Sequence, residues 1–177
     1  KRRFKKANRA ITSADLVERS FGRSEPNQLW VTDITEHRTR EGKLYCCVVL
    51  DVHSRRVVGW SIDATASATL TTNALSMAIE NRQPPHGLII HADHGTQFTS
   101  WAFTQRAQRT GRLPSMGTVG ACYDNAVIEA FRGRMQTELL NRRRWRTRVE
   151  LANAIFDYLE IFHNRQRRHS GIGMLTP

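Results

Sequence analysis

The sequence predicts an α/β domain built on a mixed five-stranded sheet with helices on both faces. Three observations support this prediction. Strand-like runs joined by turn residues lie between residues 29 and 62, a continuously apolar run follows at residues 88–90, and helical periodicity occupies the segments between and after the strands. The number of elements suits a single domain of 177 residues.

The first half of the chain predicts an antiparallel meander. Three runs rich in apolar and β-branched residues lie at 29–35, 44–52 and 56–62. Turn-forming residues at 40–43 and 53–55 separate these runs, so consecutive strands can pair directly through short connections.

The middle of the chain alternates between helix and strand. Apolar residues recur near helical spacing at 68–81, and prolines follow shortly afterwards. The run at 88–93 opens with three consecutive apolar residues, which is typical of a central strand covered on both faces. A helix at 101–109 and a short fifth strand within 112–119 are predicted next.

The C-terminal part is predicted to be helical. Asp124 is a good N-cap for a long helix with an apolar stripe at i, i+3, i+7 and i+11, formed by Ile128, Phe131, Met135 and Leu139. A last helix is predicted at 149–163. The resulting order, β-β-β-α-β-α-β-α-α, is that of the ribonuclease H-like fold.

The N-terminal segment differs from the rest of the chain. Residues 1–27 are polar and basic, with only a short helix predicted at 13–19, so we expect an arm or linker there and the folded core at 28–177. The chain begins without Met and ends on Leu-Thr-Pro, so we expect a fragment of a longer protein.

Charge and composition limit the partners. Lys and Arg number 27 against 16 Asp and Glu, a formal net charge of +11, which favours a polyanion such as nucleic acid or an anionic membrane surface. The excess is concentrated at residues 1–9 and 132–168. No apolar run approaches the ~20 residues needed to cross a bilayer, and no signal-peptide core follows the basic N-terminus. We therefore expect a cytosolic chain.

Three cysteines without C-x-x-C spacing argue against a disulfide framework or a zinc knuckle. Cys46, Cys47 and Cys122 are interpreted as buried reduced thiols, and Cys122 lacks a partner base for thiol chemistry. A zinc site at His-x-Asp-His, residues 91–94, is disfavoured because no further ligand lies at suitable spacing.

Three acidic residues stand where a plain core would not place them. Asp33 interrupts the first strand, Asp93 ends the fourth, and Glu129 projects from the long helix. In the predicted sheet the first and fourth strands are neighbours and the helix packs beside them, so the three carboxylates converge. Like charges in a poorly solvated pocket repel unless a cation binds, and oxygen-only ligands select Mg²⁺ or Mn²⁺. Two such ions would support displacement at a phosphodiester.

The spacing and contexts of these acids resemble the D, D-35-E triad of the retroviral integrase and transposase superfamily. Exactly 35 residues separate Asp93 from Glu129, and the contexts are WVTDIT, HADHGTQF and CYDNAVIEAF. The resemblance is closest to the catalytic protein of IS-three-type bacterial insertion sequences. It extends from about residue 27 to the end, including NRQRRHS at 164–170 and LTP at 175–177.

The resemblance implies that Asp33 bridges two Mg²⁺ ions, with Asp93 on one and Glu129 on the other. It implies DNA cleavage at transposon ends and strand transfer by the freed 3′-OH, by a homo-oligomer in the DNA complex, in the bacterial cytoplasm at the nucleoid. The family usually has Ser after the Glu and Lys seven residues beyond it, whereas this chain has Ala130 and Gln136. Arg132, three residues after Glu129, is a candidate to supply the missing charge near DNA.

Several polar residues beside the acids are candidates for supporting roles. His91 and His94 could orient a metal-bound water or contact the scissile phosphate, and Gln97 lies in a polar loop that could touch DNA. Asn125 is expected to cap the helix or donate a hydrogen bond near Glu129. Asp51 is interpreted as a turn residue that accepts hydrogen bonds from Ser54 or backbone N–H groups, with a supporting role at the metal site as the alternative.

Basic residues in the C-terminal part are the candidate DNA contacts. A solvated charge run is the usual alternative, but five arginines within residues 142–148 favour phosphate contacts, with Trp145 packing rather than stacking on a base. The predicted DNA-binding residues are Arg132, Gln136, Arg142, Arg143, Arg144, Arg146, Arg148, Arg165, Arg168 and His169.

The function predicted is that of a DNA transposase catalytic core. A structure-selective nuclease of the same fold and an inactive DNA-binding remnant are the alternatives. No helix-turn-helix or leucine-zipper pattern is present in the sequence, so recognition of specific DNA ends is expected from a missing N-terminal portion or a partner protein.

Overall fold

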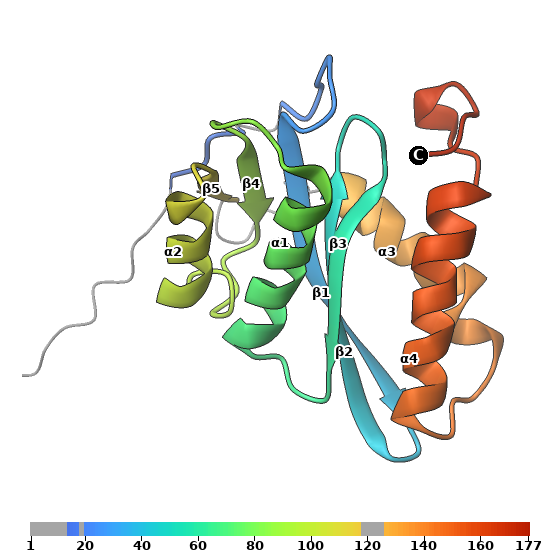
Figure 1. Cartoon of the computed structure of the whole chain (residues 1–177). Coiled ribbons are helices and arrows are strands. Elements are labelled where there is room, and N and C mark those ends of the chain that lie inside the picture. Colours follow the sequence, from blue (N-terminus) through green and yellow to red (C-terminus); the bar gives the residue numbers. More distant parts are fainter. Residues whose placement is uncertain (1–13, 18–19, 118–125) are drawn as a thin grey trace, which may run out of the picture.

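A computed structural model describes residues 14–17, 20–117 and 126–177, which form one five-stranded sheet between two helical layers (Figure 1). The strand order is β3-β2-β1-β4-β5. The strands β1, β2 and β3 pair antiparallel, whereas β1, β4 and β5 pair parallel. Their bounds are Leu29–Thr39 (β1), Gly42–Asp51 (β2), Val57–Asp63 (β3), Ile89–Ala92 (β4) and Leu113–Met116 (β5). The predicted mixed sheet is therefore confirmed.

The helices are distributed over both faces of the sheet. On one side lie α1 (Ala68–Arg82) and α2 (Trp101–Arg109), and on the other lie α3 (Ala126–Glu138) and α4 (Arg148–Phe156) (Figure 1). Side-chain oxygens of Ser67, Ser100 and Thr147 accept hydrogen bonds at the N-termini of α1, α2 and α4. Within the described residues no helix is long and apolar enough to span a bilayer.

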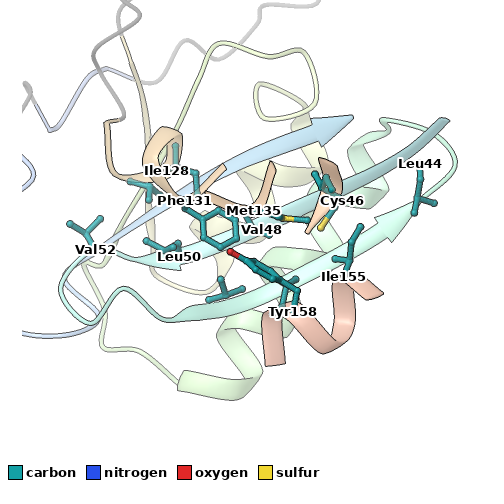
Figure 2. Close-up of a cluster of buried hydrophobic side chains, with 14 of the residues drawn as sticks. Leu44, Cys46, Val48, Leu50, Val52, Ile128, Phe131, Met135, Ile155 and Tyr158 are labelled. Carbon is teal, nitrogen blue, oxygen red and sulfur yellow. The ribbon is translucent and has the colours of Figure 1, made fainter. Parts of the chain in front are cut away.

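Alternate residues of the internal strand β2 face the two helical layers. Leu44, Cys46, Val48 and Leu50 face α3 and α4, where they pack with Ile128, Phe131, Met135, Ile155 and Tyr158 (Figure 2). The intervening Cys47 and Val49 face α1 and α2. Both cysteines of this strand are free and buried, and burial raises the pKa of Cys47 to about 12. The prediction of buried thiols is confirmed for these two, whereas Cys122 lies outside the described residues.

A glycine allows α1 to approach the sheet closely. A Cβ added to Gly59 would lie 2.7 Å from the Ala78 Cβ and closer still to the Ala74 carbonyl oxygen. The backbones of β3 and α1 are therefore in direct contact across small residues.

The outer edge of β3 is held by amide side chains. Asn164 accepts from Val57 N–H and donates to the Val57 carbonyl, both at 2.9 Å. At the irregularity beside Leu50, Asn81 donates to the Val58 carbonyl at 3.1 Å. The start of this edge strand is therefore fixed from both helical layers.

Some predicted boundaries were wrong. The first strand continues to Thr39, because its second half pairs with β2 through the hairpin although it has no partner on the β4 side. The last helix is not a single α-helix, since α4 ends at Phe156 and Asp157–His163 (η2) is a π-helix. Two short 3₁₀ segments, Leu140–Arg142 (η1) and Ser170–Ile172 (η3), complete the elements. The cap predicted at Asp124 lies outside the described residues.

Part of the predicted arm packs on the domain. Instead of the predicted helix, residues 16 and 17 form a bend in which the Asp15 carboxylate accepts from Val17 N–H at 2.9 Å. Leu16 N–H donates to the Ser115 hydroxyl, and Val17 is buried in the core. The polar side chains at this point satisfy the backbone locally, which competes with helix formation.

Candidate active site

Asp33 lies on β1 just beyond the point where β1 stops pairing with β4. The parallel pairing of β1 with β4 ends at Val31 opposite His91, and β4 stops at Ala92. Asp33 and Asp93 each follow this last pair by two residues, so the two-residue period directs them to the same face. The Asp33 side chain is only 16% exposed, whereas Asp93 is exposed.

The third acid, Glu129, stands exposed in the first turn of α3. Its neighbours Ile128 and Phe131 are buried against the sheet and fix the helix in place. Burial raises the pKa of Asp33, the Arg132 guanidinium opposes this, and the charges of Asp93 and Glu129 raise the pKa further. The structure therefore brings the other two predicted acids within electrostatic reach of Asp33.

Both carboxylate oxygens of Asp33 already have partners. Arg132 Nη1 lies 3.2 Å from Oδ2, and Ile34 N–H donates to Oδ1 at 2.8 Å. The Asp93 Oδ1 accepts from Gly95 N–H at 2.9 Å. In the described part of the chain, no three His, Cys, Asp or Glu side chains are close enough together to hold one metal ion. The donors suit a hard divalent cation, but in this arrangement Arg132 supplies the positive charge next to Asp33.

The residues predicted to support the three acids differ in burial and in hydrogen-bonding partners. The ring of His91 is buried and shares a hydrogen bond of 3.0 Å with the Ser115 hydroxyl, so its Nδ1 faces β5. Gln97 donates to the Ala66 carbonyl at 3.1 Å and ties the loop after β4 to the start of α1. His94 is half-buried in that loop, and Asn125 lies outside the described residues.

Asp51 has the turn role that was predicted for it. Its fully buried carboxylate accepts from Ser54 N–H at 2.8 Å and from the Ser54 hydroxyl at 3.0 Å. It also accepts from Asn27 N–H and the Trp30 indole. These four hydrogen bonds explain how the buried Asp51 carboxylate is stabilised without a metal ion.

Comparison with known proteins identifies the family. Residues 23–122 match the family described as integrase core domain, and residues 110–177 match a second family of the same description. The chain belongs to the integrase core domain family. The InsF transposase of insertion sequence IS3A from Escherichia coli K12 is 40% identical over 165 residues, 93% of this chain and 57% of the relative. The IS600 uncharacterized 31 kDa protein of Shigella sonnei is 39% identical over 92% of this chain and 60% of the relative. The chain thus spans about 60% of their length.

Solved structures support the ribonuclease H-like fold of this integrase core domain. The HTLV-2 integrase catalytic core domain in complex with magnesium superposes with a TM-score of 0.60 at 22% identity, covering 82% of this chain and 92% of that one. The simian T-cell lymphotropic virus intasome in complex with PP2A regulatory subunit B56 gamma gives a TM-score of 0.62 at 16% identity, covering 81% of this chain and 50% of that one.

Part of the arginine run is tied into the integrase core fold. Arg148 Nε donates to the Lys43 carbonyl at 2.9 Å and joins α4 to the β1–β2 hairpin. The Arg143 guanidinium lies 4.3 Å from the centroid of the Trp145 ring. Trp145 is itself buried and donates to the Leu140 carbonyl, so this ring packs as predicted. These side chains have structural roles whether or not DNA binds.

Other predicted DNA contacts of the integrase core lie on its surface. Gln136, partly buried, donates to Asn141 at 2.6 Å and is turned toward η1. His169 differs from the rest because it is only 4% exposed. The exposed candidates are Arg132, Arg142, Arg143, Arg144, Arg146, Arg165 and Arg168.

Sequence reasoning missed two arginines at the far end of the sheet. Arg38 and Arg40, at the β1–β2 hairpin, line a cavity of about 540 Å³ together with Arg144. Charged residues at alternate positions in the second half of β1, Glu36 and Arg38, are the sequence signal that would have found Arg38. The basic surface of the integrase core therefore extends beyond the arginine run at 142–148.

Proposed function

We propose that this integrase core domain is the catalytic core of a DNA transposase. It cleaves DNA at the ends of an insertion sequence and joins the freed 3′-OH to a second strand. The relatives named as transposases and the similar integrase core in complex with magnesium support this function. The observation that carries the proposal concerns the environment of Asp33. Its carboxylate is largely buried and lies two residues beyond the last pair between β1 and β4. Burial and the charges of Asp93 and Glu129 raise its pKa.

Asp33, Asp93 and Glu129 would hold two Mg²⁺ or Mn²⁺ ions. Carboxylate oxygens are the ligands that these hard cations prefer, and a cation would counter the burial and the like-charge repulsion that raise the pKa of Asp33. When bound, such ions activate the attacking oxygen and stabilise the leaving oxygen of a phosphodiester.

Arg132 has two successive roles in this proposal. Its guanidinium neutralises Asp33 before metal binds, at the 3.2 Å contact. Because a bound cation and the guanidinium would repel each other at the same carboxylate, Arg132 moves away from Asp33 when a metal ion binds. The released side chain lies three residues from Glu129 on α3 and is free to contact a DNA phosphate nearby.

The partners follow from the chemistry. Exposed arginines on and after α3 hold DNA phosphates, and a homo-oligomer holds the two DNA ends that must be paired. Recognition of specific end sequences comes from a helix-turn-helix module in another part of the longer protein or in a separate chain.

The test measures nicking of supercoiled plasmid and joining of a labelled duplex with a free 3′-OH, each with Mg²⁺ or Mn²⁺. Replacing Asp33, Asp93 or Glu129 with Ala should lower both activities ~100-fold or more and weaken Mn²⁺ binding measured by electron paramagnetic resonance. The control is Asp157→Ala, an exposed acid on the surface after α4, which should retain activity. Nicking that survives all three substitutions would refute the metal triad.

A second candidate is a DNA-binding remnant without catalysis. The contact between Arg132 and Asp33, and the absence of a compact three-ligand group among the described residues, favour it. The substitution Arg132→Gln separates the two. If the site is functional, this variant should bind Mn²⁺ at least as well as the parent chain and bind duplex DNA more weakly. A remnant would bind DNA without metal-dependent nicking, and a nuclease would nick without joining strands.

A further inference from the structure

A second site lies on the flank of α3, beside the C-terminal segment. A cavity of about 270 Å³ opens between α3, the turn after β2, and the residues that follow η2. Apolar atoms of Leu50 and Phe131 form part of its wall. The polar lining comes from Arg55, Arg134, His163, His169 and Ser170, and among the described residues no acid contributes to it.

His169 is buried in this cavity without a hydrogen-bonding partner for its ring. Its side chain is 4% exposed, and within the described residues neither ring nitrogen has a partner. The ring is held edge-on against His163, with centroids 4.9 Å apart, and its backbone N–H donates to the Leu175 carbonyl at 3.0 Å. Buried polar groups are nearly always hydrogen-bonded, so a fixed imidazole with two unused nitrogens indicates a missing ligand.

The two arginines of the cavity are also unused. Neither the Arg55 nor the Arg134 guanidinium makes an ion pair or hydrogen bond with another residue in the ranges that the structure describes. A Cβ added to Gly171 would lie 3.5 Å from Arg55 Nη2, so this guanidinium faces the turn that carries His169. Burial and the charge of Arg134 lower the pKa of Arg55, whereas the charge of Asp51 raises it.

The described acids that act electrostatically on this pair are engaged by other donors. Asp51, whose charge raises the pKa of Arg55, already accepts hydrogen bonds from Asn27, Trp30 and Ser54. Glu138, which acts electrostatically on His169, is already engaged by Arg167 and Tyr158, each at 2.7 Å. The cavity therefore combines two guanidinium groups that make no ion pair among the described residues with a buried imidazole, whose pKa burial lowers to about 4. An anion with several acceptor oxygens can accept from both guanidinium groups and from the one N–H of the neutral imidazole.

We propose that this cavity is a phosphate subsite, in which Arg55, Arg134 and His169 donate to the oxygens of one phosphate group. Arg134 lies two residues from Arg132 on α3, which places the subsite on a different side of the helix from Asp33. The ligand is a backbone phosphate of DNA, an assignment that rests on the proposed function, or free inorganic phosphate.

The first experiment titrates inorganic phosphate into the whole chain and follows the histidine ring nitrogens by NMR. The His169 resonances should shift saturably, and Arg134→Gln should lower the affinity ~10-fold because one charge-assisted pair is lost. The matched control is Arg109→Gln, an exposed arginine of α2 in the opposite helical layer, which should leave the affinity unchanged. Thermal melting verifies that both variants are folded.

The second experiment identifies the source of the phosphate. Affinity for a labelled duplex is measured over a range of KCl concentrations by fluorescence anisotropy. A salt slope reduced by ~1 in Arg134→Gln but unchanged in Arg109→Gln would assign the subsite to the DNA backbone. Phosphate binding with an unchanged slope would assign it to free phosphate. Absence of both effects would overturn the subsite. Because neither measurement needs Asp33 or a metal ion, failure of catalysis would leave this result intact.

Discussion

Replacing Gly59 with Ala should loosen the contact between β3 and α1. The new Cβ would lie 2.7 Å from the Ala78 Cβ, where ordinary contact begins near 3.4 Å, so the two elements must move apart by roughly 0.7 Å or more. The atoms that the new Cβ would meet are backbone atoms of α1 and the Cβ of Ala78, so no side-chain rotation can relieve the clash. Overpacking of this kind costs ~1–3 kcal/mol, and we expect about 3 kcal/mol here because the helix must shift as a unit. For a chain of this length that corresponds to a fall in Tm of roughly 6–12 °C.

The assay is urea denaturation followed by circular dichroism and tryptophan fluorescence, with Gly133→Ala as the matched control. Gly133 lies within α3, is exposed, and has open space around its Cβ position. The same substitution there should stabilise the protein by ~0.5–1 kcal/mol through helix propensity. Opposite signs for the two variants are the expected result. A Gly59→Ala variant within ~0.5 kcal/mol of the parent chain would refute the close-approach argument.

Three further predictions concern buried polar groups. Asn164→Ala should lower the free energy of unfolding by ~2–4 kcal/mol, because both Val57 backbone groups lose their partner, whereas exposed Gln166→Ala should change it little. Asp51→Ala should cost a similar ~2–4 kcal/mol in the same urea titration, since its four hydrogen bonds are lost. Burial holds the pKa of His163 at about 4, below its ~6.5 in the unfolded chain, so stability should fall by up to ~3 kcal/mol from pH 6.5 to 4 as the unfolded chain takes up the proton. Replacing His163 with Phe should flatten this slope in pH-dependent melting, and an unchanged slope would contradict the assignment.

The individual strands could be predicted because their signals are local, whereas the neighbouring positions of β1 and β4 were expected from the ribonuclease H-like fold. Strands β1 to β4 follow runs of apolar residues, and α2 has the predicted bounds, 101–109. The neighbouring positions of Asp33 and Asp93 follow from strand order together with the two-residue period. The roles of these acids and of Glu129 in metal binding stay predictions.

The features that could not be predicted depend on contacts between distant residues. Nothing near Arg132 in the sequence indicates that it pairs with Asp33, 99 residues away. The burial of His169 depends on η2 and on the C-terminal turn, which carry no charge pattern of their own. Continuous apolar periodicity at 149–163 predicts an α-helix and does not distinguish the π-helix that begins at Asp157.

The hydrogen bonds that Asn164 and Asn81 make with β3 also limit which strands can pair with it. An edge strand with free N–H and C=O groups is a template for intermolecular β-pairing and aggregation. Asn164 occupies both groups of Val57, and Asn81 occupies the Val58 carbonyl, so a second chain cannot extend the sheet at this end. In the proposed assembly on DNA, copies of this chain would therefore associate through surfaces other than the start of β3. Loss of either asparagine would be expected to promote self-association of the folded protein as well as to reduce its stability.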